Sequence, residues 1–134
     1  MSEELTLGFL GAGRMATALA RGFIQAKLAR ADRIMAGDPL EAARSSFARE
    51  VGAKTTASNL ELLKFAGVLL LAVKPDQVTG VLEEIRSQFA GQHLLISIAA
   101  GVTLAKLEAS MGNAARVIRV MPNTPALLGA SATA

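Results

Sequence analysis

The chain has 134 residues, 51% of them hydrophobic and 19% charged, so it is long and apolar enough to bury the core of one domain. Its longest unbroken apolar stretch, residues 65–73, is about half as long as a membrane-spanning helix, and we expect no membrane partner. Because the chain has no cysteine and one histidine, disulfides and thiolate metal sites are excluded, and we expect no metal.

The formal net charge is +3, with fourteen basic residues scattered among eleven acidic ones instead of forming a stripe. Tyr and Trp, which stack on bases, do not occur, so we expect no nucleic-acid partner. A mildly basic surface suits an anionic small molecule such as a nucleotide. Glu3 and Glu4 stand where a secretory signal carries positive residues, and we expect a cytoplasmic protein.

The first half of the chain alternates between strand-like and helix-like stretches. The pattern predicts a strand over residues 5–10, a helix over about 13–27 and a second strand over 33–37. A helix that opens on Pro39 is predicted to run to about residue 50, since the N–H that proline lacks has no partner in a first turn.

Gly52 ends that predicted helix, and a brief extended piece leads to Ser58, a typical N-cap for a helix over residues 59–65. Residues 68–73, VLLLAV, lack alternation, which is typical of a strand covered on both faces. A helix over residues 75–87 is predicted to bury one side, formed by Val78, Val81, Leu82 and Ile85.

A strand is predicted over residues 94–98, then a short helix that Thr103 caps and that runs to residue 110, then a sixth strand over residues 116–120. This alternation with short links predicts the α/β class: a Rossmann-type doubly wound, mostly parallel sheet with helices on both faces, forming one domain over residues 1–134. The apolar end of the chain leads us to expect a following domain in a longer parent protein, the alternative being a naturally short chain.

A glycine-rich turn joins the first predicted strand to the first predicted helix, and it has the pattern G-x-G-x-x-A. Gly11 permits the tight turn, Gly13 lets a pyrophosphate approach the backbone, and Ala16 lets helix and strand pack closely. The pyrophosphate would lie at the helix N-terminus, where free N–H groups favour an anion. The alternative is a glycine-rich turn without a ligand, but its strand–turn–helix context favours a dinucleotide.

Asp38 follows the second predicted strand, where the dinucleotide pattern has an acidic residue that binds the ribose hydroxyls. Its carboxylate would also repel a 2′-phosphate. The alternative is that Asp38 only caps the helix beginning at Pro39, and both roles can hold together, with one carboxylate oxygen each.

In open α/β sheets, ligands bind at the carboxyl ends of the strands, so the segments after the later strands matter. Lys74 is interpreted as an anion or cofactor contact or as a solvated lysine. Asn123 and Thr124, between two prolines, offer an amide and a hydroxyl to a ligand, or they form a structured turn. His93 has no matched acid or nucleophile nearby and is expected to be a satisfied surface histidine.

Four segments together resemble one family, the pyrroline-5-carboxylate reductases. They are residues 8–16 (GFLGAGRMA), 72–75 (AVKP), 97–103 (SIAAGVT) and 117–125 (VIRVMPNTP), and the resemblance runs to about residue 132. It implies an NAD(P)H-dependent oxidoreductase of proline biosynthesis, which reduces the ring imine of 1-pyrroline-5-carboxylate to L-proline by hydride transfer. It also implies a helical C-terminal domain, absent from this chain, that forms a homo-oligomer and completes the substrate pocket, so we expect the isolated chain to be inactive.

The resemblance also implies site residues, carried over by matching position. The pyrophosphate would be bound by Gly11, Ala12, Gly13, Arg14 and Met15, with Asp38 and Asn59 near the adenosine ribose. The nicotinamide side would be formed by Ala72, Val73, Lys74, Pro75 and Ala100, with Asn123 and Thr124 close behind. No catalytic acid is evident in this chain.

The cofactor, NADP or NAD, stays open. The family often has Ser, Thr or Asn-Arg near Asp38, so this aspartate favours NAD, while Arg44, Lys54 and the backbone could still accommodate a 2′-phosphate. Other functions also stay open: a related Rossmann reductase, such as a deazaflavin-dependent NADP reductase or a β-hydroxyacid dehydrogenase, a nucleotide-sensing domain without catalysis, and an interaction module.

Overall fold

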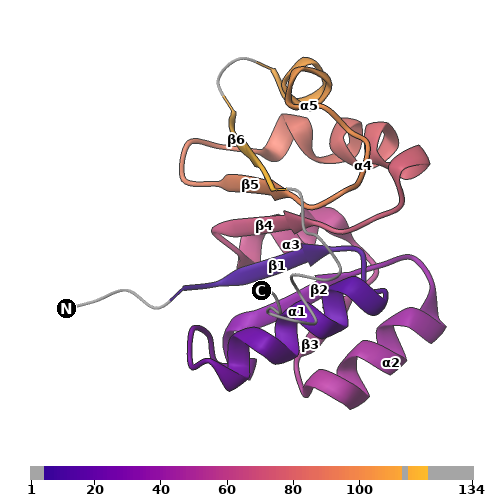
Figure 1. Ribbon diagram of the computed structural model, residues 1–134, viewed down its shortest axis with the longest axis vertical. Coiled ribbons are helices and arrows are strands. Elements are labelled where there is room, and N and C mark those ends of the chain that lie inside the picture. Colours follow the sequence, from indigo (N-terminus) through magenta and orange to yellow (C-terminus); the bar gives the residue numbers. More distant parts are fainter. Residues whose placement is uncertain (1–4, 113–114, 121–134) are drawn as a thin grey trace, which may run out of the picture.

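Six parallel strands form one sheet in the order β3-β2-β1-β4-β5-β6 (Figure 1). The computed structural model describes residues 5–112 and 115–120. The chain starts in the middle of the sheet, builds outward to β3, then returns to the other side of β1 and builds outward to β6. The strands are β1 (Leu7–Leu10), β2 (Ile34–Gly37), β3 (Lys54–Thr56), β4 (Val68–Leu71), β5 (Leu94–Ser97) and β6 (Arg116–Arg119). The predicted Rossmann-type doubly wound fold is confirmed.

Helices cover both faces of the sheet. On one face, α1 (Arg14–Gln25) and α2 (Glu41–Val51) pack on a core that includes Phe9, Phe47 and Ile34, all fully buried. On the other face lie α3 (Asn59–Phe65), α4 (Val78–Ile85) and α5 (Leu104–Met111). The apolar side predicted for α4 is confirmed, because Val78, Leu82 and Ile85 are buried and Val81 packs against the same core.

Three short 3-10 helices complete the fold: η1 (Ala31–Arg33), η2 (Pro75–Gln77) and η3 (Arg86–Gln88). The last two replace both ends of the single helix predicted over residues 75–87. Pro75 is compatible with a first turn because it lacks only an N–H that has no partner there. Tighter turns of this kind are frequent at helix ends.

The predicted caps are confirmed at two helices. The Ser58 hydroxyl accepts a hydrogen bond from the Glu61 N–H, and the Thr103 hydroxyl accepts one from the Lys106 N–H. The prediction that Pro39 opens α2 is wrong, since the helix begins at Glu41. Asp38 causes the delay, because its carboxylate accepts the Leu40 N–H and holds residues 38–40 in a turn.

Residues 5–112 and 115–120 hold neither a membrane span nor a cluster of metal-binding side chains. No helix there has the length and apolarity that crossing a bilayer requires. Within the same residues, no three side chains of His, Asp or Glu gather closely enough to hold a metal ion.

Candidate cofactor site

The carboxyl ends of β1, β2 and β4 meet at one edge of the sheet, where the chain direction divides. β1 pairs with β2 on one side and β4 on the other, with Leu10 opposite both Gly37 and Leu71. The loops after β1 and β4 leave toward opposite faces, which creates the crevice where doubly wound folds bind nucleotides. The residues predicted to bind the dinucleotide lie around this crevice.

Gly11 directly follows β1 and has a backbone conformation that favours glycine. Its φ is +106°, and its N–H donates to the Gly37 carbonyl at 2.8 Å. A Cβ placed on Gly11 would lie 3.0 Å from the Ala72 carbonyl oxygen. The predicted tight turn is therefore present, and the start of the loop after β4 closes against it.

Gly13 is the N-cap of α1 and faces open space. It is exposed, and no atom lies within 4 Å of where its Cβ would stand. The first bond of the helix runs from the Thr17 N–H to the Gly13 carbonyl at 3.0 Å, so the N–H groups of Arg14, Met15 and Ala16 have no acceptor within α1. Free donors beside open space fit the pyrophosphate of a dinucleotide.

Ala16, the last residue of the G-x-G-x-x-A pattern, lets α1 pack closely against β1, as predicted. It is fully buried, in the same core cluster as Ala12 and Phe9. Without a larger side chain at this point, α1 rests directly on β1, so its first turn stays at the edge of the sheet.

Asp38 lies at the end of β2, where the sequence predicted it, and its carboxylate is bound to backbone on both sides. Oδ2 accepts the Ala12 N–H at 2.9 Å, and Oδ1 accepts the Leu40 N–H at 2.9 Å. The Arg44 guanidinium donates to the Asp38 carbonyl at 2.8 Å. The acidic residue, the glycine loop and one arginine are thus assembled in a single turn.

Asn59 reaches the same edge from the start of α3. Its Nδ2 donates to Glu84 at 3.1 Å, whereas its Oδ1 is buried without a partner among the described residues. A Cβ on Gly37 would lie only 2.6 Å from that Oδ1. Sequence reasoning missed this requirement for glycine at position 37, although a glycine directly before Asp38 was a visible signal of close approach.

The loops after β4 and β5 run side by side, as the Ile98 N–H donates to the Leu71 carbonyl at 3.1 Å. Ala72 and Val73 are half-buried, whereas Lys74, Pro75 and Ala100 are exposed. Among the described residues, Lys74 has no side-chain contact that distinguishes a ligand contact from a solvated lysine. Asn123 and Thr124 lie outside the described residues.

One hydrogen bond that holds the loop after β5 was not predicted from the sequence. The Arg119 guanidinium, at the end of β6, donates to the Val102 carbonyl at 2.6 Å. This bond fixes the segment that follows Ala100. Its two residues come from different predicted elements, so spacing in the sequence carried no sign of it.

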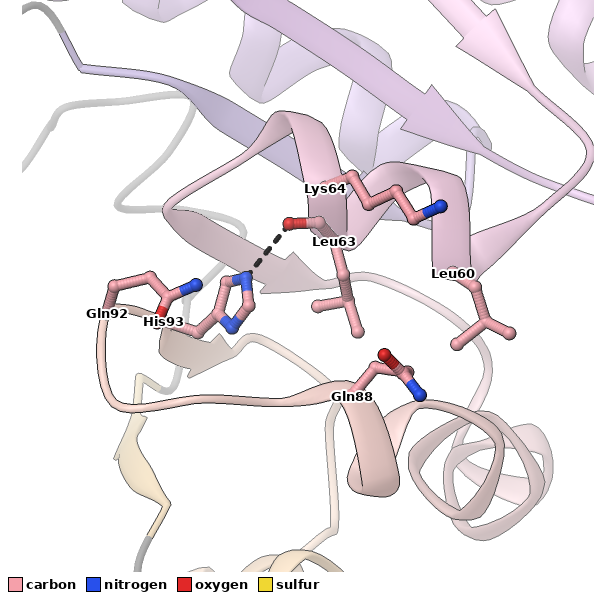
Figure 2. Close-up of a pocket in the computed structure, with 6 residues that line it drawn as sticks. All are labelled: Leu60, Leu63, Lys64, Gln88, Gln92 and His93. Atoms are coloured by element: carbon pink, nitrogen blue, oxygen red, sulfur yellow. Dashed lines mark hydrogen bonds between the residues drawn. The ribbon is translucent and has the colours of Figure 1, made fainter.

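His93 is satisfied, as predicted, but the prediction that it lies at the surface is wrong. Only 4% of it is exposed. Nδ1 accepts the Ala90 N–H and Nε2 donates to the Leu63 carbonyl, each at 2.9 Å (Figure 2). The ring is buried because the turn before β5 folds against the end of α3.

A hollow of about 450 Å³ lies beside His93 (Figure 2). His93 directly precedes β5, at the amino end of the strands, whereas the crevice lies at their carboxyl ends. It is lined by Leu60, Leu63, Lys64, Gln88, Gln92 and His93. Both ring nitrogens of the histidine are already bonded, so the ring offers nothing to a ligand there. This hollow is therefore separate from the candidate cofactor site.

A second hollow of about 520 Å³ opens between α1 and α2, directly beside the glycine loop. Arg21 and Glu50 face each other across it with 3.6 Å between their charged atoms. It is lined by Ala12, Gly13, Arg14, Thr17, Ala18, Arg21, Ala43, Ser46 and Glu50. Lys54, by contrast, lies over the Phe65 ring at 5.5 Å, near the start of β3 and away from Asp38.

Residues 6–101 match the model of a family described as NADP oxidoreductase coenzyme F420-dependent. The chain is 42% identical to pyrroline-5-carboxylate reductase 3 of Bos taurus over 122 residues. This alignment covers 91% of this chain and 39% of the bovine protein. It is 40% identical over 133 residues to pyrroline-5-carboxylate reductase 2 of Homo sapiens, covering 96% and 42%. The chain therefore spans less than half the length of these curated relatives.

Solved structures agree. A pyrroline-5-carboxylate reductase from Coxiella burnetii superposes with a TM-score of 0.86 at 33% identity, over 94% of this chain and 47% of that one. The Plasmodium falciparum pyrroline carboxylate reductase with NADP bound gives 0.80 at 33% identity, over 96% and 46%. Prephenate dehydrogenase from A. aeolicus, at 13% identity and a TM-score of 0.75, shares the fold. The resemblance indicated by the four sequence segments is confirmed.

Proposed function

The chain belongs to the family described as NADP oxidoreductase coenzyme F420-dependent, and from this membership we propose that it is the dinucleotide-binding part of a pyrroline-5-carboxylate reductase. One observation carries the proposal: the open first turn of α1 beside Gly13, at the edge where β1 separates β2 from β4. The Plasmodium falciparum relative with NADP bound supports the same cofactor class.

The described residues have definable roles in this function. The N–H groups of Arg14 and Met15 bind the pyrophosphate, and Gly13 leaves the room it needs. The backbone of Ala72 and Val73, with Ala100 from the next loop, orients the nicotinamide ring against the imine. When bound, the reduced cofactor supplies the hydride, and the protein contributes position and exclusion of water.

The substrate is proposed from the names of the relatives. The further domain and the assembly are proposed from the resemblance of the four sequence segments, and the cytoplasmic location from the acidic residues near the start of the sequence. The substrate is 1-pyrroline-5-carboxylate, reduced to L-proline in proline biosynthesis in the cytoplasm. A further, helical domain of a longer parent protein completes the substrate pocket and forms a homo-oligomer. The 134-residue chain alone binds cofactor without producing proline.

The test is a calorimetric titration of the 134-residue chain with NADPH and with NADH, after circular dichroism has established that it is folded. We expect binding of at least one of them with a dissociation constant in the micromolar to millimolar range. A folded chain that releases no heat with either would overturn the proposal. Gly22→Ala, on the exposed side of α1 with open space around it, is the control, and it should bind like the wild type.

The family description favours a second candidate, a reductase that exchanges hydride between NADP and the deazaflavin coenzyme F420. The family match ends at residue 101, whereas the human relative aligns over 96% of the chain and so includes residues after 120. This longer match favours the imine reductase. Oxidation of NADPH by the longer parent protein with F420, but not with 1-pyrroline-5-carboxylate, would reverse the order.

A further inference from the structure

Asn59 is the first residue of α3, and its carboxamide lies against Gly37, the last residue of β2. A Cβ on Gly37 would lie only 2.6 Å from the carboxamide oxygen. The Gly37 carbonyl accepts the Gly11 N–H at 2.8 Å, so the carboxamide adjoins the glycine loop. A dinucleotide whose pyrophosphate lies beside Gly13 extends its adenosine half toward the end of the second strand. Asn59 therefore stands beside the place of that adenosine.

The two ends of this carboxamide have different surroundings. Oδ1 is buried without a partner among the described residues, while Nδ2 donates to Glu84 Oε1 at 3.1 Å. In the reverse orientation the carboxamide oxygen would face a carboxylate, which only accepts hydrogen bonds, and two N–H donors would be buried against Gly37. Leaving one acceptor unpaired costs less than leaving two donors unpaired. Glu84 therefore determines which way the carboxamide faces.

The packing of α4 fixes the position of Glu84. Leu82 and Ile85, close to it in the helix, are fully buried, whereas Glu84 itself is exposed. Leu62 belongs to the same core cluster as Leu82, so α3 and α4 are held against one core. The Glu84 carboxylate consequently stays within reach of Asn59 without being part of the core.

We propose that Glu84 is a positioning residue, which orients the Asn59 carboxamide so that its second Nδ2 N–H donates to the adenosine half of the cofactor. A carboxamide nitrogen has two N–H groups, and the bond to Glu84 uses one of them. The acceptor on the cofactor is an uncharged ribose oxygen, because the Glu84 carboxylate would repel a phosphate oxygen at the same place. The inference rests on the proposed function and deepens it, because it adds a residue of α4 that does not touch the cofactor.

The test compares adenosine 5′-diphosphate with inorganic pyrophosphate, because both fit the glycine loop and only the first has an adenosine. Titrations of the 134-residue chain are followed by NMR. Glu84→Met removes the acceptor and should weaken binding of adenosine 5′-diphosphate three- to tenfold, with pyrophosphate binding within twofold of the wild type. Loss of the negative charge alone would strengthen binding of both anions, so the direction of the change separates the two causes.

Two further variants serve as controls. Glu83→Met removes the same charge from the neighbouring exposed position and should bind both probes at least as tightly as the wild type. Glu84→Gln keeps an acceptor oxygen within reach of Asn59 and should bind adenosine 5′-diphosphate within twofold of the wild type. Equal weakening by Glu84→Met and Glu83→Met, or equal weakening of both probes by Glu84→Met, would overturn the positioning role.

Asn59→Ala shows whether Glu84 acts through Asn59. It should weaken binding of adenosine 5′-diphosphate at least as much as Glu84→Met does, and adding Glu84→Met to it should change the affinity less than twofold. A further loss as large as in the wild-type background would mean that Glu84 acts by another route, and the inference would be wrong. Should Asn59→Ala prove unfolded by circular dichroism, Asn59→Ser, with its shorter side chain, takes its place.

The side-chain amide of Asn59 gives a direct spectroscopic readout. Its proton bonded to Glu84 should move upfield in Glu84→Met and keep its position in Glu83→Met, and an unchanged signal in Glu84→Met would contradict the bond. If the folded wild-type chain binds neither pyrophosphate nor NADPH, the proposed function itself fails, and the inference with it. If both bind and neither Glu84→Met nor Asn59→Ala changes binding of adenosine 5′-diphosphate, the dinucleotide site stands and the role of Glu84 is wrong.

Discussion

Two glycines a few residues apart serve opposite purposes. Gly8, in the middle of β1, is needed by the core, because its Cβ would lie 2.8 Å from Ala66 Cβ and 2.9 Å from Leu69 Cδ1. Gly13 has no atom within 4 Å of the same position, so the fold does not need a glycine there. A substitution at one should therefore affect stability, and at the other ligand binding.

Gly8→Ala should lower the free energy of unfolding by about 1–3 kcal/mol, because α3 must move away from β1 to admit the methyl group. Urea denaturation followed by circular dichroism measures the change. Gly22→Ala, in open space on α1, is the matched control and should not destabilise the chain. Equal stability of Gly8→Ala and wild type would mean that α3 does not pack on β1 as closely as described.

Gly13→Ala should keep the free energy of unfolding within about 1 kcal/mol of the wild type, the size of an N-cap effect. Its methyl group occupies the space that the pyrophosphate needs, so the affinity for NADPH should fall about tenfold or more. Calorimetry and denaturation on one preparation measure both quantities. Unchanged affinity in a stable variant would place the pyrophosphate elsewhere.

His93 shows how a residue can act on stability at a distance from the site. Replacement by alanine leaves the Ala90 N–H and the Leu63 carbonyl without their partner, which should cost about 1–3 kcal/mol in the free energy of unfolding. Cofactor affinity should not change, since the ring lies at the opposite end of the strands. Gln92→Ala, its exposed neighbour, serves as control. A loss of cofactor affinity without a loss of stability would contradict this separation.

At the scale of elements, local chemistry was readable from the sequence and long-range contacts were not. The caps at Ser58 and Thr103 and the buried strand β4 follow from neighbouring residues, and the structure confirms them. The bond between Asp38 and Ala12 joins residues 26 positions apart, and it forms only because β1 and β2 are adjacent. The burial of His93 depends on tertiary contacts in the same way, so sequence periodicity could not reveal it. The late start of α2, by contrast, follows from the local bond between Asp38 and the Leu40 N–H.

At the start of α3, the Thr56 hydroxyl takes part in the capping interaction between Ser58 and Glu61. Ser58 and Glu61 have the spacing of a capping box, in which the glutamate would reach back to the Ser58 N–H. Instead the Thr56 hydroxyl accepts the Ser58 N–H at 3.1 Å and donates to Glu61 at 2.6 Å. Thr56 is the last residue of β3, so one hydroxyl ties this edge strand to the helix that carries Asn59.

Thr56→Val keeps the shape of the side chain and removes this hydroxyl. The free energy of unfolding should fall by about 1–2 kcal/mol, because the half-buried Ser58 N–H loses its acceptor. Thr55→Val, one residue earlier in β3, is the control and should have a smaller effect. Thermal denaturation compares the two, and an equal loss in both variants would mean that the hydroxyl of Thr56 contributes nothing beyond strand propensity.

In the whole molecule, the residues proposed to bind the cofactor lie at the carboxyl ends of the strands. The two buried apolar clusters that stabilise the fold lie on the two faces of the sheet. Both faces are covered by helices, and the two apolar clusters meet the sheet along β1 and β4. The loops of the crevice therefore stand on strands that are already fixed. A dinucleotide should add stability through binding, without having to order the fold.

Saturation with NADPH should raise Tm, because a ligand that binds only the folded state stabilises it by an amount that grows with the logarithm of its concentration relative to Kd. At one hundred times Kd the gain is about 2.7 kcal/mol, which for a chain of this length corresponds to roughly 10 °C. Differential scanning calorimetry over a series of NADPH concentrations measures the shift. Gly13→Ala, with an affinity at least tenfold lower, should gain no more than about 1.4 kcal/mol at the same concentrations, so its Tm should rise by about half as much or less. A similar rise in both proteins would mean that the nucleotide stabilises the chain from a position other than the glycine loop, because the variant differs from the wild type only at that loop.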